Sequence, residues 1–292
     1  MDRRATGSLL LFGKGAGERM LRDADRAAAD GLEIGWIDRG EAVQRVPWLD
    51  SAVFESALYV ATDGVVDIHA LLWRYLGEAT ARGARTVFGC RVDSVDVAGG
   101  RVCGVRTNLG RIASPVVVDA AGAWANAVAT SAGLDPLPMT PFRRHLVVTP
   151  PLPGVEPGWP VVWAAGPEYY FRPETGGLLL SPCDQTAAEP GTALRDPAIL
   201  DVLAERLAAF VPRLAGIPVK RYWAGLRTIT GDGRFVIGPD PRLPGFFWVA
   251  GLGGHGMTGS AAIGETAAAM ILGKTVEPRI LHSIEAARFL AK

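Results

Sequence analysis

Several features that mark common protein classes are scarce in this sequence of 292 residues. Its three cysteines, Cys90, Cys103 and Cys183, are widely spaced and form no C-x-x-C pair, so we expect neither a disulfide framework nor a zinc site. No apolar run reaches the roughly 18 residues that a membrane span requires. The first residues lack the apolar core of a signal peptide. A reducing, cytoplasmic location is therefore expected.

An excess of charge is also lacking, because 30 basic residues balance 30 acidic ones and no run of like charge occurs. This balance argues against nucleic acid or an anionic membrane as the main partner. No cluster of His, Asp and Glu has the spacing of metal ligands, so no metal site is predicted. The 49% of hydrophobic residues are enough to bury a sizeable core, in one large domain or two interleaved ones.

The chain alternates short strands with moderate helices. Ser8–Phe12 reads as a buried strand and about Gly17–Ala29 as a helix. A second helix is capped by Asp67 and closed by Gly83. Its expected apolar face consists of Ile68, Leu71, Leu72, Tyr75 and Leu76.

Further strands follow this helix. TVFGCRVDSVDV and RVCGVRT form a hairpin around Gly99 and Gly100. The continuous apolar run of residues 116–118 suits a strand buried on both faces. The Pro- and Gly-rich stretch from Pro136 to Gly166 marks a crossing into a second layer or domain.

The second part begins with EYYFRPETGGLLLSP, which reads as two antiparallel strands with Tyr170 and Arg172 on one face. A helix starts at Asp196 and Pro197, with Asp196 as its cap. The remaining strands are predicted over Val219–Leu226, Arg234–Gly238 and Phe246–Ala250, before a helix that ends at Leu272. The fold class that these elements predict is α+β, with a mixed sheet.

A glycine-rich loop joins the last strand to the last helix, in the segment VAGLGGHGMTGSAAIGE. We expect the backbone N–H groups of Gly254, His255, Gly256 and Met257 to lie bare at the helix N-terminus. The partial positive charge there favours an anion or an electron-rich oxygen.

Five segments in series carry a family resemblance: VVVDAAGAWANAVATSAGL, FRRHLVVTPP, YYFRPETGGLLLSP, WAGLRTITGDGRFVIGP and VAGLGGHGMTGSAAIGETAAAMI. In this order and spacing they resemble the FAD-dependent oxidoreductases of the D-amino acid oxidase family, which includes glycine oxidase and the sarcosine oxidases. The resemblance implies an α/β-derived, Rossmann-like FAD-binding domain over residues 1–135 and 222–292. A substrate domain with a mixed or antiparallel sheet would span residues 136–221, and residues 1–60 could join it.

One family feature is lacking, namely the opening strand, G-x-G-x-x-G turn and helix that hold the ADP half of FAD. Gly13, Gly15 and Gly17 in FGKGAGERM have the spacing G-x-G-x-G instead, and an ordinary turn is the favoured interpretation. The chain therefore resembles a family member without its N-terminal βαβ unit. Three alternatives stay open: the coding start lies upstream, another chain supplies the unit, or flavin binds poorly.

The resemblance implies contacts to FAD along two segments and at one further position. The loop would contact the pyrimidine end of the flavin, through Leu252, Gly253, Gly254, His255, Gly256, Met257 and Thr258. Ala121, Gly122 and Trp124 would allow backbone contact at a strand end, and Val92 would face the adenine. The alternatives are an empty glycine turn and tight packing of small residues. Because Gly225 stands where some sarcosine oxidases attach flavin through cysteine, the FAD would be non-covalent.

Three side chains are the candidate catalytic residues. Arg227 would bind the substrate carboxylate through two parallel hydrogen bonds, with a strand arginine that pairs with Asp232 or with solvent as the alternative. Tyr170 would line the same pocket, with core packing as the alternative. His255 would pack or donate a hydrogen bond near the flavin, with a role as catalytic base as the alternative.

The implied activity is oxidation of an amine or small amino acid at its C–N bond, by hydride transfer to the flavin. The alternative is a catalytically silent family member, or a subunit of a split enzyme that needs a partner chain to bind FAD. A homo-oligomer is a further alternative. The resemblance also leaves open which amine is oxidised, and whether dioxygen or another carrier takes the electrons.

Overall fold

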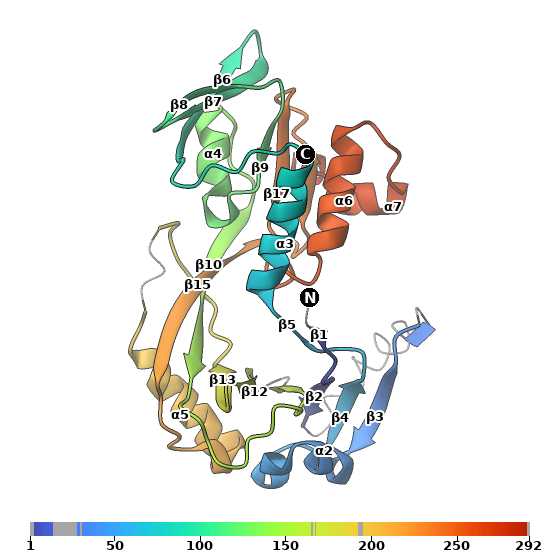
Figure 1. The fold of residues 1–292 in the computed structure, drawn as a ribbon, viewed down its shortest axis with the longest axis vertical. Helices are drawn as coiled ribbons and strands as arrows, with labels where there is room; N and C mark the ends of the chain where they lie inside the picture. The colour runs from blue at the N-terminus through green and yellow to red at the C-terminus, as the bar shows by residue number, and fades with distance from the viewer. Residues whose placement is uncertain are drawn as a thin grey trace. The chain divides into compact units, whose positions relative to one another are not determined.

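The computed structural model describes residues 3–290 apart from 14–27, 30, 165, 167 and 192–194. All but the last two positions of the helix predicted over Gly17–Ala29 lie outside the described residues, as do Gly15 and Gly17. The chain forms two compact units (Figure 1). The first unit comprises Met1–Gly77, Arg144–Gln185 and Leu194–Ala224, and the second comprises Glu78–Arg143, Thr186–Ala193 and Gly225–Lys292. The predicted assignment of FAD and substrate to separate domains stays a prediction.

A mixed sheet forms the centre of the first unit. Its strands lie in the order β10 (Met139–Val148), β13 (Gly177–Ser181), β12 (Tyr169–Glu174), β11 (Val161–Ala164), β2 (Ser8–Phe12), β4 (Ser56–Val60) and β3 (Ile34–Asp38). β11 and β2 are parallel, whereas the other pairs with assigned registers in this series are antiparallel. β14 (Thr186–Ala187) and β15 (Arg221–Thr230) each pair with β10. The predicted strand Ser8–Phe12 and the antiparallel pair around residues 174–177 are confirmed.

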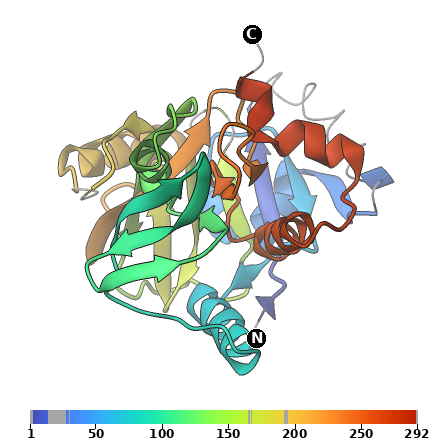
Figure 2. The same cartoon turned by 90° about the horizontal axis from the view of Figure 1, so that it is seen from above.

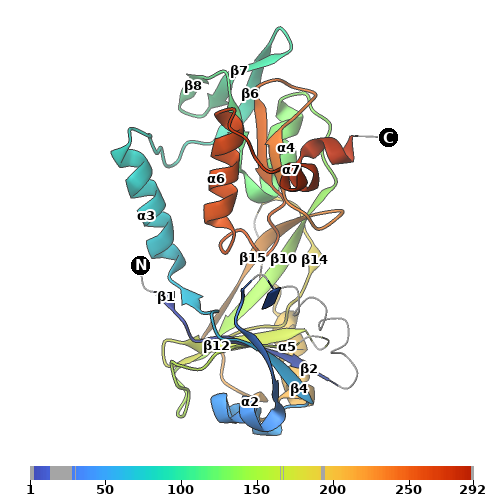
Figure 3. The same ribbon diagram turned by 90° about the vertical axis from the view of Figure 1, so that its right-hand side faces the viewer.

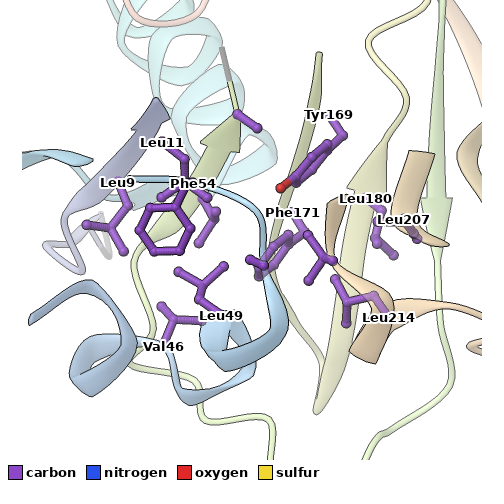
Figure 4. Packing of buried hydrophobic residues seen from close by; sticks show 14 of the residues in the cluster. Leu9, Leu11, Val46, Leu49, Phe54, Tyr169, Phe171, Leu180, Leu207 and Leu214 are labelled. Atoms are coloured by element: carbon purple, nitrogen blue, oxygen red, sulfur yellow. The ribbon is translucent and has the colours of Figure 1, made fainter. Parts of the chain in front are cut away.

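One face of this sheet carries the main core of the first unit. Leu9, Leu11, Tyr169 and Phe171 are buried on this face (Figure 4). They pack in one cluster with residues of α2 (Arg39–Arg45), η1 (Pro47–Ser51), α5 (Ala198–Phe210) and η3 (Pro212–Leu214). Because side chains alternate along a strand, Tyr170 and Arg172 lie on the other face, as predicted.

Helix starts follow the predicted caps. The Ala70 N–H donates to Asp67 Oδ1 at 2.9 Å, at the start of α3 (Ile68–Ala81). The Ala198 N–H donates to Asp196 Oδ1 at 3.1 Å, at the start of α5. No residue of α3 is fully buried by the described part of the chain. On its predicted apolar face Ile68, Leu72 and Tyr75 are exposed, and Leu71 and Leu76 are half-buried. The short strands β1 (Arg3–Arg4) and β5 (Val65–Val66) pair with each other before this helix.

The second unit contains two three-stranded sheets. One is the antiparallel series β6 (Val92–Ala98), β7 (Arg101–Thr107) and β8 (Gly110–Ala113), seen in Figure 2. Gly99 and Gly100 have φ angles of 57° and 71°. These left-handed conformations suit the tight turn that was predicted between β6 and β7.

The other sheet has the order β16 (Val236–Pro239), β17 (Phe246–Ala250) and β9 (Val117–Asp119). β17 pairs with β16 in the antiparallel sense and with β9 in the parallel sense. The prediction that residues 116–118 are buried on both faces is wrong, because Val118 is 43% exposed. β9 is an edge strand of this sheet. The side of the strand that carries Val117 packs against the core, whereas the side that carries Val118 does not.

Helices complete the second unit: η2 (Gly122–Trp124), α4 (Ala125–Ser131), α6 (Ser260–Ile271), α7 (Pro278–Ile284) and η4 (Ala286–Phe289). Figure 3 shows α6 and α7 near the end of the chain. Ile263 and Ala267 of α6 pack on Ile237 and Phe247 of the mixed sheet. No helix in the described part of the chain is long and apolar enough to cross a bilayer. The fold is therefore of mixed α and β content, with mixed and antiparallel sheets, as the α+β prediction requires.

Candidate functional site

The glycine-rich loop between β17 and α6 folds differently from the sequence expectation. The N–H of His255 donates to the carbonyl of Leu252 at 3.0 Å, so the prediction that this amide is bare is wrong. The physical reason is that residues 252–259 form successive turns, and α6 begins only at Ser260. The N–H of Gly259 correspondingly donates to the His255 carbonyl at 2.9 Å.

Other amides of this loop remain as predicted. Within the described residues, the N–H groups of Gly254, Gly256 and Met257 form no hydrogen bond. Gly251 and Gly253 adopt φ angles of 67° and 53° at the entry to the loop, a conformation that glycine adopts without strain. The loop can therefore offer several backbone donors to an electron-rich group.

Arg227 lies against this loop. A Cβ atom placed on Gly254 would be 3.2 Å from Arg227 Nη1 and 3.6 Å from its Cζ, so the guanidinium rests directly on the glycine. An isolated bridge between Ile229 and Leu252 joins β15 to the start of the loop. The structure thus brings together two features that the sequence separates by 27 positions, counted from Arg227 to Gly254.

The alternative pairing of Arg227 with Asp232 is wrong. Asp232 Oδ2 instead accepts from Arg288 Nε at 2.8 Å, and this hydrogen bond holds the pKa of Asp232 well below its usual range. Arg227 forms no ion pair with any residue in the described ranges. Its charge is therefore available to an anionic ligand, and a guanidinium suits a carboxylate because it binds both oxygens.

The opposite side of β15 faces a cavity. Because successive side chains of a strand point to opposite faces, Thr228 points away from the side of Arg227. Its hydroxyl is buried and has no hydrogen-bond partner among the described residues. It lines a cavity of about 430 Å³ together with Gly122, Ala123, Asn126, Met139, Thr140, Pro141, Ala187, Ala188, Glu189 and Pro190.

The predicted strand-end contacts line a second cavity. Ala121, Gly122 and Trp124 surround a space of about 420 Å³, together with Ala120, Ala123, Gly191 and Leu226. Gly122 has a φ of 59°, and no atom lies within 4 Å of a Cβ built on it, so it opens on free space. The predicted adenine contact, Val92, opens β6 and is exposed.

Asp119 is a buried acid that the sequence analysis did not single out. It ends β9 and is only 2% exposed. Oδ1 accepts from the N–H of Ala121 at 3.0 Å, whereas Oδ2 has no partner within the described chain. Burial raises the pKa of Asp119 to about 7, against the opposing effect of the Ala121 hydrogen bond. The sequence feature that could have identified Asp119 is its position directly after the apolar run of residues 116–118.

The other two predicted catalytic side chains, His255 and Tyr170, belong to different units. His255 is exposed, and its ring centroid is 6.4 Å from that of Phe235. No described residue forms a hydrogen bond with the His255 ring. Tyr170 belongs to the first unit, and its ring centroid is 6.2 Å from that of Trp163, which the sequence analysis missed.

His145, in the segment FRRHLVVT, is completely buried. Nδ1 lies 2.7 Å from Asp184 Oδ2, and Nε2 accepts the N–H of Asp196 at 3.0 Å. Because Nε2 is an acceptor, the ring proton is on Nδ1, where it is donated to the carboxylate. His145 therefore connects β10 to the start of α5, and we assign it a structural role.

Comparison with known families and proteins gives a consistent result. The family model described as "FAD dependent oxidoreductase" (DAO) matches residues 1–270. Glycine oxidase of Geobacillus kaustophilus is 31% identical over 229 residues, covering 76% of this chain and 57% of that protein. Sarcosine oxidase subunit beta of Rhizobium meliloti is 27% identical, covering 75% of this chain and 54% of the relative.

A human relative, mitochondrial sarcosine dehydrogenase, is 27% identical over 89% of this chain, which spans only 30% of that protein. The chain thus spans between about a third and three fifths of these relatives. Among solved structures, L-proline dehydrogenase from P. horikoshii has a TM-score of 0.86 at 26% identity, covering 95% of this chain and 75% of that one.

Proposed function

Because the chain belongs to the family of FAD-dependent oxidoreductases and is similar to glycine oxidase and sarcosine oxidase, we propose that it oxidises an amine or small amino acid at the C–N bond. The observation that carries this proposal is the placement of Arg227. Its guanidinium, without an ion pair in the described part of the chain, rests on Gly254 in a loop with unused backbone donors. A cation beside such donors suits a substrate carboxylate next to an electron-rich cofactor.

Family membership implies FAD, and the residues of the loop fit this cofactor. The free amides of Gly254, Gly256 and Met257 would donate to flavin oxygens. We assign the neighbouring positions Leu252, Gly253, His255 and Thr258 to the same contact. When bound, FAD supplies the acceptor for a hydride from the carbon that bears the amine. We propose non-covalent binding because Gly225 offers no thiol.

A second contact to FAD is proposed at the end of β9. Ala121, Gly122 and Trp124 line a cavity. Because Gly122 has no side chain and opens on free space, the backbone can approach the cofactor there. Val92 is the proposed contact for the adenine. These assignments rest on the open space beside Gly122 together with the family resemblance.

The substrate would be oriented mainly by Arg227. Two hydrogen bonds from the guanidinium to the carboxylate fix the position of the adjacent carbon, and orientation of this kind contributes several kcal/mol to catalysis. We assign Tyr170 to the pocket wall and His255 to a hydrogen bond near the cofactor. Loss of a hydride from the neutral amine leaves an iminium ion, which water hydrolyses to a carbonyl compound and an ammonium ion.

The test is an anaerobic reduction experiment on the purified chain loaded with FAD. Sarcosine, glycine, L-proline and D-alanine are added in turn, with lactate as a substrate analogue that lacks the amine. We expect at least one amine to bleach the flavin absorbance and to yield the corresponding carbonyl product, whereas lactate does neither. A loaded chain that no amine reduces, while dithionite still reduces it, would contradict the proposal.

A second candidate function is that of a subunit in an assembled enzyme. It is favoured by the edge of β9, where Val116 and Val118 are both exposed, and a parallel neighbouring strand could pair there. The relative from Rhizobium meliloti is itself named as a subunit. This candidate predicts a folded chain that stays colourless with millimolar FAD, whereas the first predicts a yellow one.

A further inference from the structure

The cavity of about 430 Å³ beside Thr228 lies entirely within the second unit, because each residue that lines it belongs to that unit. We call it the Thr228 cavity. A water molecule takes up roughly 30 Å³ in the liquid, and pockets for small molecules begin at about 300 Å³. The Thr228 cavity is therefore large enough for a small organic molecule.

The Thr228 cavity is separate from the position proposed for the substrate carboxylate. Arg227 and Thr228 are consecutive on β15, so their side chains point to opposite faces of the strand. Arg227 rests on Gly254, whereas no residue of the loop 252–258 lines the cavity. A ligand of the cavity would therefore be held by residues other than Arg227 and the loop.

The Thr228 hydroxyl is the polar group that a ligand would satisfy. Thr228 is 8% exposed, and its Oγ1 has no hydrogen-bond partner among the described residues. A buried hydroxyl without a partner destabilises the folded state. Asn126 lines the same cavity, but its side chain donates to the Leu137 carbonyl at 2.9 Å and accepts from the Leu137 N–H at 3.0 Å. Thr228, unlike Asn126, is thus left for a ligand.

The charge of the lining residues favours a cation. Glu189 is the one charged residue among those described as lining the cavity, and its side chain is exposed. It forms no ion pair within the described part of the chain. An exposed carboxylate is ionised at neutral pH, so it attracts a cation and repels an anion.

Most of the remaining lining suits a short hydrocarbon group. The apolar lining residues include Met139, Pro141, Ala187, Ala188 and Pro190. No aromatic side chain is among the described residues that line the cavity, so they form no cage for a quaternary ammonium group.

We propose that the Thr228 cavity binds a small primary ammonium compound with a compact apolar group. Thr228 Oγ1 accepts one N–H of the ammonium group, Glu189 supplies the opposite charge, and the apolar residues contact the hydrocarbon. A primary ammonium group is favoured because only an N–H donor satisfies the threonine oxygen. The site goes beyond the proposed oxidation, because its ligand is bound and not converted.

The test is an NMR titration of the isotope-labelled, FAD-loaded chain with tert-butylammonium. The carbon that bears the nitrogen in this compound has no hydrogen, so hydride transfer cannot consume it. We expect saturable shifts of the backbone N–H signals of Gly122, Ala123 and Ala188, which line the cavity. The N–H signals of Gly254 and Gly256 should not shift. tert-Butanol and pivalate, which have nearly the same shape, should bind more weakly or not at all.

Glu189→Gln should weaken binding of tert-butylammonium about threefold, because an exposed ion pair is worth little. Glu265→Gln is the matched control, because it removes the same charge from an exposed residue of α6 that does not line the cavity. It should leave binding unchanged. Thr228→Val should weaken binding about fivefold. Because it removes a buried hydroxyl without a partner, Thr228→Val should also raise the Tm of the chain without tert-butylammonium.

Several results would overturn the inference. The largest shifts at Gly254 and Gly256 would place the compound beside Arg227 instead. Equal affinity for tert-butanol or pivalate would remove the preference for a cation, and equal loss in Glu189→Gln and Glu265→Gln would remove Glu189 from the site. The absence of any saturable shift would also contradict the proposal.

The two proposals of this article fail in different ways. A chain that takes up no FAD is titrated without it, since no step of the argument for the Thr228 cavity needs the cofactor. Binding of tert-butylammonium at Ala188 by such a chain would support the cavity site while contradicting the proposed function. Reduction of bound flavin by an amine, without any shift at Ala188, would do the reverse.

Discussion

The two units each bury an ionisable residue, but these two residues differ in whether their polar atoms have hydrogen-bond partners. In the first unit, His145 has partners for both ring nitrogens, Asp184 on Nδ1 and the Asp196 N–H on Nε2. In the second unit, Asp119 is just as inaccessible, yet its Oδ2 has no partner in the described part of the chain. A satisfied polar network specifies one packed arrangement, whereas an unsatisfied group costs stability.

A second buried polar group of the second unit resembles Asp119. The Thr228 hydroxyl, on the strand that carries Arg227, also lacks a partner among the described residues. Buried polar groups are usually hydrogen-bonded in folded proteins, so each exception needs an explanation. We infer that Asp119 and Thr228 are kept for a ligand, while the His145 network serves only the fold.

The largest effect is expected from His145→Ala. Removal of the ring takes the His145 partner from Asp184 Oδ2 and from the Asp196 N–H and leaves a cavity, whereas Asp184 Oδ1 keeps its hydrogen bond from the backbone N–H of residue 145. We expect the free energy of unfolding to fall by ~4 kcal/mol, measured by urea denaturation. His282→Ala, which removes an exposed ring bonded to the Pro278 carbonyl, is the control and should have little effect. Equal losses in both variants would remove the structural role of His145.

Arg227→Ala should have the next largest effect, on activity rather than folding. We expect KM for amino-acid substrates to rise about 100-fold, or ~2.7 kcal/mol, because the carboxylate loses two charge-assisted hydrogen bonds. Simple amines without a carboxylate serve as the internal control, and their KM should change little. An equal change for both substrate classes would remove Arg227 from its assigned role.

Asp119→Asn should stabilise the protein at alkaline pH. The pKa of Asp119 is raised from 3.8 to about 7 in the folded chain, so the unfolded state loses the proton first as pH rises. The contribution of Asp119 to the free energy of unfolding is therefore largest below about pH 4. It falls as the pH rises to about 7 and is constant above that. We expect the variant to be more stable by ~2 kcal/mol near pH 8 and equal to wild type near pH 4.

Thermal unfolding of both proteins across this pH range measures the difference between them. Using the difference is necessary because Asp232 and Asp240, whose pKa values are lowered, lose their stabilising effect as pH falls. A gap between variant and wild type that is independent of pH would show that Asp119 does not titrate in this range.

Gly254→Ala should have the smallest effect. The new Cβ would lie 3.2 Å from Arg227 Nη1, so the guanidinium must move by a few tenths of an ångström. We expect KM for amino acids to rise roughly threefold, with stability little changed. Gly264→Ala on α6 is the control, because no atom lies within 4 Å of its Cβ position. An unchanged KM in Gly254→Ala would show that the contact between Arg227 and the loop is not needed.

Local sequence signals predicted much of the fold. The Asp67 cap, the turn at Gly99 and Gly100, and the alternation of Tyr170 with buried neighbours all depend on residues close in sequence, and the structure has them. Burial of Val118 was predicted wrongly because it depends on which strand lies at the sheet edge, which periodicity does not show.

The candidate site residues stay a prediction, and the contacts among them could not be predicted from the sequence. Long-range packing determines the contact of Arg227 with Gly254. It also determines that Asp232 pairs with Arg288 and not with Arg227. The buried hydrogen bonds of His145 could not be predicted from local sequence, because its partners, Asp184 and Asp196, are 39 and 51 positions away. Trp163 was missed for a different reason, since its exposure and its contact with the Tyr170 ring follow from sheet register.

Equilibrium titration of the purified chain with FAD tests the central claim most directly, because the loop amides and Arg227 are assigned to a flavin site. We expect the chain to bind one FAD, to turn yellow, to keep the flavin through gel filtration and to release it intact on denaturation. A folded chain that remains colourless and shows no change in flavin absorbance or fluorescence at any FAD concentration would contradict the account.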